Sequence, residues 1–241
     1  MENMIEIREL YHKYQDGQKL RAVLKDVNID FEAGKMYAIL GESGSGKTTL
    51  LSLISGLDEV QEGSISYQGN TISKIGYTKY RKDYVNVIFQ SYNLIKYMTA
   101  MENVVTAMDI KHVDYSNKKE KAYEILGKLG IDRQTADREV LKISGGEQQR
   151  TAIARALVHD SKVILADEPT GNLDDDTEAE IIEIFRQLAE EGKTVIIVTH
   201  SRNVAKRADI IYKIQNGVVK QENRRGKKKE VNFEEETIEI A

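Results

Sequence analysis

The sequence has no cysteine and only one proline, Pro169. Without cysteine the chain can form neither a disulfide framework nor a metal site built of thiolates, and this absence fits the cytosol. Long apolar runs are also missing. Stretches such as VIIV at 195–198 are far shorter than the ~20 residues that cross a bilayer, and the N-terminal MENMIEIREL has no apolar segment of the signal-peptide type. We therefore expect a soluble chain whose role at a membrane, if any, comes through a partner.

The composition allows a packed core but gives no strong electrostatic preference. Of the 241 residues, 40% are apolar and 31% are charged, with a formal net charge of −4. This length predicts one large domain or two small ones, and the slightly negative charge predicts no nucleic-acid partner. From residue 223 the chain differs, because NRRGKKKE is basic and EEE at 234–236 is acidic. Such a tail is typical of a solvated end, with contact to lipid head groups or a partner loop as the alternative.

Hydrophobic periodicity predicts strands that alternate with helices. Half-buried strands are expected over 4–14 and 22–31, and a strand over 35–41 leads into a glycine-rich loop and a helix over 48–56. Further strands are expected at 63–70, 85–90, 163–169 and 194–200, and helices at 99–110, 117–130 and 178–192. Apolar strands that alternate with helices predict an α/β fold with a parallel sheet covered on both faces. The segment from residue 91 to about 142 reads as a helical insert.

The octapeptide GESGSGKT at 41–48 follows a predicted strand and opens a predicted helix. This context favours a phosphate-binding loop over a simple glycine-rich turn. Backbone N–H groups would face the phosphates, Lys47 would reach the β- and γ-phosphates, and the Thr48 hydroxyl would ligate Mg²⁺. The residues expected at the nucleotide are Gly41, Glu42, Ser43, Gly44, Ser45, Gly46, Lys47, Thr48 and Thr49.

Two adjacent carboxylates end the buried strand ILADE. Asp167 would hold Mg²⁺ through water, and Glu168 can face the attacking water. The alternative is a pair of acids that cap the next loop, but the phosphate loop favours the catalytic interpretation. Pro169 ends the strand and stiffens the turn that carries these acids.

Three more residues at predicted strand ends are candidates. His200 ends an apolar strand and would point to the carboxyl edge of the sheet, where α/β proteins bind ligands; a structural histidine is the alternative. Gln90 would touch Mg²⁺ or water and report the nucleotide state to the insert, or be a buried amide. Tyr14 is favoured over Tyr11 for stacking on adenine because it lies at the strand end, although either could be a packed residue. The remaining histidines show no ligand spacing, so we expect no metal site beyond nucleotide-bound Mg²⁺.

A second anion-binding end is predicted about a hundred residues after the first. KISGGEQQR at 142–150 places a small hydroxyl, two glycines and polar side chains before a helix-like apolar stretch. This composition is typical of a helix N-terminus that holds an anion.

Together these motifs resemble the nucleotide-binding subunit of ABC transporters over roughly residues 4–220. In the family's order, the matching motifs are Walker A (GESGSGKT), Q-loop (Gln90), signature (ISGGEQQR), Walker B (VILADE), D-loop (NLD at 172–174) and H-loop (His200). Three departures are mild. Ile143 stands where the signature usually has leucine, Glu147 where glutamine is frequent, and Glu42 where proline is common.

The resemblance implies an ABC-type nucleotide-binding domain that binds ATP and Mg²⁺. Its phosphate-loop NTPase core, with a parallel sheet and an antiparallel β subdomain, would comprise residues 1–90 and 159–222. The inserted helical subdomain with the signature would comprise 91–158, and the charged tail 223–241. The Mg²⁺ ligands would be Thr48, Gln90 and Asp167.

The resemblance also implies a head-to-tail homodimer with ATP between its subunits. The loop at 41–48 of one copy would face the signature of the other, which answers why one chain carries two phosphate-facing ends. The partner copy would supply Ser144, Gly145, Gly146, Glu147 and Asp174. Glu168 would act as general base or orient water, while Lys47, His200 and Ser144 in trans stabilise the charge on the phosphate oxygens. Hydrolysis would loosen the dimer and swing the insert, with Gln90 at its root.

The string DEPTGNLD at 167–174 is similar to one branch of the family, which serves lipoprotein release, macrolide and antimicrobial-peptide export, and cell division. This resemblance implies an integral-membrane permease of FtsX/MacB-like type and a peripheral location on the cytoplasmic side of the membrane. Two alternatives stay open. The same ATPase could serve a peptide-sensing or cell-division permease complex, or the chain could be a soluble ABC ATPase that acts on DNA or ribosomes. The absence of sustained heptads and of a second cassette argues against the soluble type.

Overall fold

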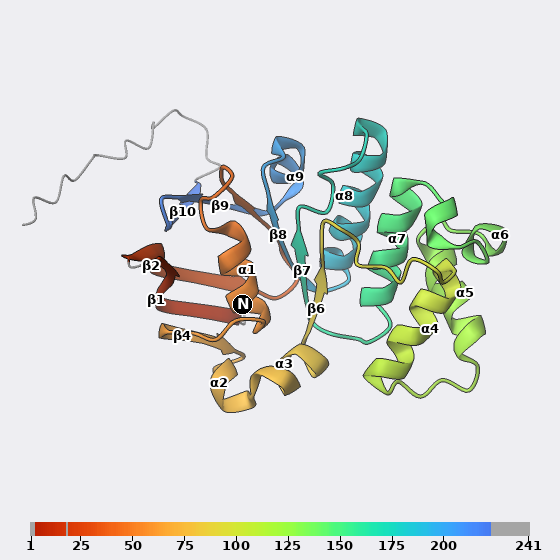
Figure 1. Ribbon diagram of the computed structural model, residues 1–241, viewed down its shortest axis with the longest axis horizontal. Coiled ribbons are helices and arrows are strands. Elements are labelled where there is room, and N and C mark those ends of the chain that lie inside the picture. The colour runs from red at the N-terminus through yellow and green to blue at the C-terminus, as the bar shows by residue number, and fades with distance from the viewer. Residues whose placement is uncertain (1–2, 18, 223–241) are drawn as a thin grey trace, which may run out of the picture.

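The computed structural model describes residues 3–17 and 19–222, so the predicted charged tail at 223–241 lies outside the described residues. Two sheets dominate the fold (Figure 1). The strands are β1 (Asn3–Asp16), β2 (Lys19–Glu32), β3 (Met36–Leu40), β4 (Glu62–Tyr67), β5 (Asn70–Thr71), β6 (Val85–Ile88), β7 (Val163–Asp167), β8 (Thr194–Thr199), β9 (Ile210–Gln215) and β10 (Val218–Glu222). The helices are α1 (Lys47–Ser55), α2 (Ile72–Ile75), α3 (Tyr77–Asp83), α4 (Ala100–Lys111), α5 (Lys118–Lys128), α6 (Arg133–Ala136), α7 (Gly145–Ala156), α8 (Asp175–Glu190) and α9 (Arg202–Arg207), with a 3₁₀ turn at Val140–Lys142.

The six-stranded sheet positions the candidate site. Its strand order is β10-β9-β3-β8-β7-β6, and all neighbouring pairs except β10–β9 are parallel. Strand β8 is buried along its whole length, and β3 and β7 are buried up to their last residue, because both faces of the sheet are covered. The prediction of a parallel sheet with apolar strands is therefore confirmed. The carboxyl ends of β3, β7 and β8 bring the loops at 41, 168 and 200 to one edge.

The smaller sheet is antiparallel and has the order β2-β1-β4-β5. Strands β1 and β2 pair over most of their length, with Tyr14 opposite Arg21. Their inward residues, such as Ile5, Ile7 and Phe31, are fully buried and share one apolar cluster with α1 and one face of the larger sheet. This packing places the turn end of the β1–β2 pair, which carries Tyr14 and Arg21, beside the loop that precedes α1.

Helices α4, α5, α6 and α7 lie on the other side of the larger sheet from β1, β2 and β4 (Figure 1). Their buried side chains, including Val104, Leu126 and Ile153, belong to one cluster with Ile164 of β7 and Phe185 of α8. The helical insert therefore exists as helices, but its core continues into the sheet. The domain boundaries at 90 and 159 stay a prediction. Among the helices of residues 3–17 and 19–222, none combines the length and the hydropathy that a membrane span requires.

Candidate active site

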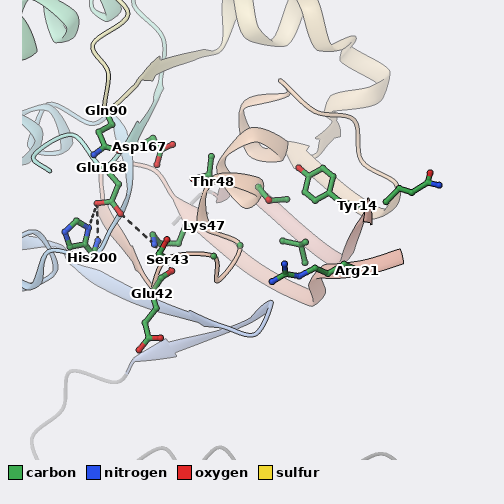
Figure 2. Close-up of a pocket in the computed structure, with 15 residues that line it drawn as sticks. Tyr14, Arg21, Glu42, Ser43, Lys47, Thr48, Gln90, Asp167, Glu168 and His200 are labelled. Atoms are coloured by element: carbon green, nitrogen blue, oxygen red, sulfur yellow. Dashed lines mark hydrogen bonds and ion pairs between the residues drawn. The ribbon is translucent and has the colours of Figure 1, made fainter. Parts of the chain in front are cut away.

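A cavity of ≈ 960 Å³ opens at the carboxyl edge of the larger sheet, where the loops after β3, β7 and β8 meet the end of the β1–β2 pair. Figure 2 shows its side chains. The lining residues are Tyr14, Gln15, Arg21, Val23, Glu42, Ser43, Gly44, Gly46, Lys47, Thr48, Thr49, Gln90, Asp167, Glu168 and His200. Segments that lie far apart in the sequence thus converge on one volume.

The loop between β3 and α1 is shaped to hold an anion. Gly46 caps α1 with a φ of 109° and offers no side-chain hydrogen bond to the helix, so the first-turn N–H groups point to the cavity without a protein acceptor from the cap. A Cβ at Gly46 would lie 3.0 Å from the Val23 carbonyl, and a Cβ at Gly41 only 2.7 Å from the Ile214 carbonyl. Ser45 Oγ is buried and, within residues 3–17 and 19–222, has no hydrogen-bond partner. These features suit a ligand with several acceptor oxygens.

Lys47 brings a positive charge to this loop. Its side chain is 8% exposed, and its Nζ donates to the carbonyls of Gly41 at 2.8 Å and Glu42 at 3.0 Å. The Nζ also lies 3.7 Å from Glu168 Oε1. The Glu42 side chain points away from Lys47 (Figure 2), so only its backbone takes part in this arrangement.

Asp167 is the last residue of β7, beside the loop, and Glu168 follows it directly. Burial, and then the neighbouring Glu168, raises the pKa of Asp167, while Lys47 and a hydrogen bond with the Thr48 hydroxyl act in the opposite direction. A carboxyl group whose pKa is raised by burial and by a second carboxylate would be stabilised in its charged form by a cation. Thr48, Gln90 and Asp167 line the same cavity and offer the oxygen ligands that Mg²⁺ prefers. These residues fit a magnesium ion that arrives with phosphates.

Glu168 is held in an unusual conformation. Its φ of 45° lies in the left-handed region, which is rare for residues with a side chain and often occurs at functional sites. The Glu168 N–H donates to the Val198 carbonyl at 2.9 Å. Its Oε2 accepts from the His200 N–H at 3.2 Å and lies 2.9 Å from His200 Nδ1. One carboxylate therefore contacts both the lysine and the histidine.

Gln90 and Tyr14 occupy opposite ends of the cavity (Figure 2). Gln90 lies in the turn after β6, which ends at Ile88 rather than continuing to residue 90 as expected. Tyr14 is 42% exposed, and its hydroxyl donates to Asp58 at 3.4 Å. Strand β1 continues two residues past Tyr14, so the expectation that Tyr14 ends the strand is wrong, although the residue does line the cavity. Tyr11 does not line it.

The second predicted anion site is not brought to this cavity. Ser144 caps α7, its Oγ accepts from the Glu147 N–H at 3.2 Å, and Glu147 Oε2 accepts from the Ser144 N–H at 2.7 Å. Gly146 packs against α8, because a Cβ there would lie 2.5 Å from Thr177 Cγ2. Asp174 caps α8 and accepts from Thr177. Thus Ser144, Gly145, Gly146, Glu147 and Asp174 form a separate cluster, none of which lines the cavity.

Sequence reasoning missed the contribution of β2 to the cavity. The lining includes Arg21 and Val23 of β2, and Arg21 lies at the same end as Tyr14 (Figure 2). Tyr14 and Arg21 are direct cross-strand partners, so their side chains share one face of the sheet. Arg21 could have been predicted only from the register of the hairpin, and the hydrophobic pattern of a single strand does not determine that register.

Comparison with known proteins identifies relatives of this chain. A family profile described as ABC transporter matches residues 24–171. The "Uncharacterized ABC transporter ATP-binding protein YclH" of Bacillus subtilis is 46% identical over 216 residues, which cover 89% of this chain and 95% of that protein. The "Macrolide export ATP-binding/permease protein MacB" of Mannheimia succiniciproducens is 40% identical over 220 residues, which cover 90% of this chain but 34% of MacB.

A solved structure has the same fold. The "Dimeric structure of a post-hydrolysis state of the ATP-binding cassette MJ0796 bound to ADP and Pi" superposes with a TM-score of 0.85 and 35% sequence identity. The match covers 92% of this chain and 100% of that one.

Proposed function

The chain belongs to the ABC transporter family and is an ATP-hydrolysing subunit of it, and on this premise we propose that two copies enclose ATP and drive a membrane permease. One observation carries the proposal. The cavity contains the lysine loop, both acids and His200, while the capped N-terminus of α7 lies outside it. One copy thus offers two incomplete halves of a phosphate site, which a two-fold arrangement would combine into two whole ones. The MJ0796 cassette, which is described as dimeric, supports this arrangement.

In the proposed complex, each part of the cavity has its own task. The first-turn amides of α1 and the Lys47 ammonium bind the phosphates, and Tyr14 stacks on adenine. Ser144 of the second copy keeps its hydroxyl proton free, because its Oγ acts as acceptor in the cap of α7, and that proton would be donated to the γ-phosphate. The amides of Gly145 and Gly146 would add further donors.

Hydrolysis needs an aligned water and compensation of phosphate charge. Glu168 accepts a proton from, or orients, the water that attacks the γ-phosphorus, and His200 holds the Glu168 carboxylate in place through two contacts. Lys47 stabilises the charge on the equatorial oxygens. A Mg²⁺ ion bound with ATP would supply further charge neutralisation, held by Thr48, Gln90 and Asp167.

The output would pass through the helical segment to a permease. Gln90 is the last cavity residue before the helices of the insert, so loss of the γ-phosphate would be sensed at its root. The MacB relative, named as an ATP-binding/permease protein for macrolide export, supports a permease of FtsX/MacB-like type. We propose that the cassette acts on the cytoplasmic side of the membrane. Its cargo would be an antimicrobial peptide, a drug or a lipoprotein-like molecule.

The Glu168→Gln variant tests this proposal. The amide keeps the shape of the carboxylate but cannot act as a base, so ATP should bind without turnover. We expect ATPase activity to fall at least about 100-fold and a dimer to accumulate with ATP, measured by size-exclusion chromatography with light scattering. Lys47→Ala is the control whose dimer should form only at a higher ATP concentration, because it weakens ATP binding itself. A Glu168→Gln protein that turns over ATP at the wild-type rate would discard the assignment of Glu168.

A further inference from the structure

A buried carboxylate joins the two loops that follow β7 and β8. Glu178, in the first turn of α8, is 9% exposed. Its Oε1 accepts hydrogen bonds from Thr170 Oγ1 at 3.1 Å and Ser201 Oγ at 2.7 Å. Its Oε2 accepts from Asn203 Nδ2 at 2.9 Å. One side chain therefore contacts the loop after β7, the loop after β8 and the start of α9.

The partners of Glu178 are sequence neighbours of the site residues. Thr170 lies two residues after Glu168, and Ser201 follows His200 directly. Two sets of contacts thus connect the two loops. In the cavity, Glu168 contacts His200 at 2.9 Å, and behind the cavity Glu178 binds Thr170 and Ser201. Only one or two backbone residues separate the second set from the first, so a change at Glu178 would shift Glu168 and His200.

Each hydroxyl at Glu178 has only one proton to donate, and Glu178 accepts it. Ser201 Oγ already accepts from the N–H groups of Asn203 and Val204, which caps α9, so its proton goes to Glu178. Burial alone would raise the pKa of Glu178, but the three hydrogen bonds and the nearby His200 outweigh it and hold the pKa below its usual range. The carboxylate is thus charged at neutral pH and fixes the orientation of both hydroxyls.

We propose that Glu178 is a positioning residue for ATP hydrolysis, which sets the separation of the Glu168 carboxylate and the His200 imidazole by fixing their loops. The inference rests on the proposed function, because that function places both side chains at the γ-phosphate. Glu178 does not line the cavity, so it would act through the two loops and not on the phosphate. Its effect on rate follows from the sensitivity of an in-line attack to geometry, since a displacement of about 1 Å can cost about 100-fold in rate.

The first test compares Glu178→Ala with Glu183→Ala. Glu183 lies on the same helix and pairs with Arg207 of α9 at 3.7 Å, so its loss also removes a contact between α8 and α9. For Glu178→Ala we expect kcat to fall about tenfold or more, while the KM for ATP stays within about twofold, because the loop at 41–49 is untouched. Glu183→Ala should keep both constants. Both are measured on the full chain, well below the Tm of each variant.

The second test is a swap that preserves the hydrogen bonds. Asn203→Asp alone sets two carboxylates 2.9 Å apart and should lower kcat. Adding Glu178→Gln should restore it, because the amide oxygen can take the place of Oε1, while the amide NH₂ can donate from the place of Oε2 to the new carboxylate on α9. We expect the double variant to regain at least about fivefold over Asn203→Asp. This pair also carries the test if Glu178→Ala does not fold.

The results separate this inference from the proposed function. If Glu168→Gln is inactive while Glu178→Ala keeps kcat within about twofold of Glu183→Ala, the role of Glu178 is overturned and the proposed function stands. A loss confined to KM, or a double variant no faster than Asn203→Asp, overturns it as well. If Glu168→Gln hydrolyses ATP normally, the proposed function fails first, whatever Glu178 does.

Discussion

At the scale of single residues, His12 is buried at a cost. It is 4% exposed, and within the described residues neither ring nitrogen has a hydrogen-bond partner. Its ring packs edge-on against Tyr14 at a centroid distance of 4.7 Å. Burial lowers the pKa of His12 below its ordinary value of 6.5, although Asp58 acts in the opposite direction. The fold therefore holds this imidazole neutral beside the proposed adenine end of the cavity.

Replacing His12 with phenylalanine should stabilise the protein, and more so in mild acid. The unfolded chain takes up a proton near pH 6.5 while the folded chain resists it until a lower pH, so wild-type stability declines as pH falls through this window. His12→Phe removes that decline and keeps the aromatic contact. We expect its Tm advantage to be about 2–4 °C near pH 8 and larger near pH 5.5, measured by calorimetry. The other histidines cancel in the comparison, and an equal Tm difference at both pH values would contradict the argument.

The residues that could be predicted at the site are those whose signal is local in sequence. Lys47, Asp167, Glu168 and His200 each end or follow an apolar strand, and the sheet edge brings all of them into one cavity. Arg21 could not be found in this way, because its place follows from its pairing with Tyr14 across the hairpin. The assigned role of each residue remains a prediction that the variants above test.

At the scale of elements, the Glu147 carboxylate at the N-terminus of α7 affects both the stability of the helix and the proposed binding of phosphate. The carboxylate of Glu147 accepts from the Ser144 N–H at 2.7 Å, which completes a capping box. In the proposed dimer, the same carboxylate puts negative charge at the end that receives the partner's phosphate. The stability of the cap favours glutamate or glutamine at position 147, whereas phosphate binding favours the uncharged glutamine.

Two substitutions of Glu147 separate these demands. Glu147→Gln keeps the cap and removes the charge, so its Tm should match the wild type while ATP-dependent dimerisation occurs at an ATP concentration about two- to fivefold lower. Glu147→Ala loses the cap, which should cost about 1 kcal/mol of unfolding free energy. Light scattering against ATP concentration and thermal unfolding measure the two effects. If Glu147→Gln dimerised no more readily than wild type, Glu147 would not face the phosphate.

The elements themselves divide by how strongly the sequence specifies them. The apolar strands and the helices α4, α5 and α8 were predicted because each has a hydrophobic pattern long enough to tell a helix from a strand. Helices α2 and α3 were missed, since they are 4 and 7 residues long and each buries a single residue, Ile72 in α2 and Tyr80 in α3. The β9–β10 hairpin was missed despite a local signal. Asn216 and Gly217, with φ of 50° and 81°, are the residues typical of its tight turn.

At the scale of the whole molecule, the fold keeps the two predicted anion-binding ends apart. Helix α1, which follows the phosphate loop, belongs to the cluster that includes the small sheet, whereas α7 belongs to the cluster of the helical segment. The two ends thus pack in different apolar clusters on the two faces of the larger sheet, which keeps them apart within one copy. In the proposed dimer a second copy of the chain would bring them together, and ATP would then be both substrate and bridge.

Mixed dimers test this shared site directly. Lys47→Ala and Ser144→Arg should each abolish ATPase activity as homodimers, because both of their sites carry one lesion. In a mixed dimer one site carries both lesions and the other is intact. With equal amounts of the two proteins and free exchange, half of the dimers are mixed with one working site each, so activity should return to roughly one quarter of wild type. Exchange is verified with two differently tagged subunits. If tagged mixed dimers formed but stayed inactive, either the two copies do not share a site or one intact site cannot work alone. A monomer that hydrolysed ATP at the wild-type rate would contradict the proposed dimer.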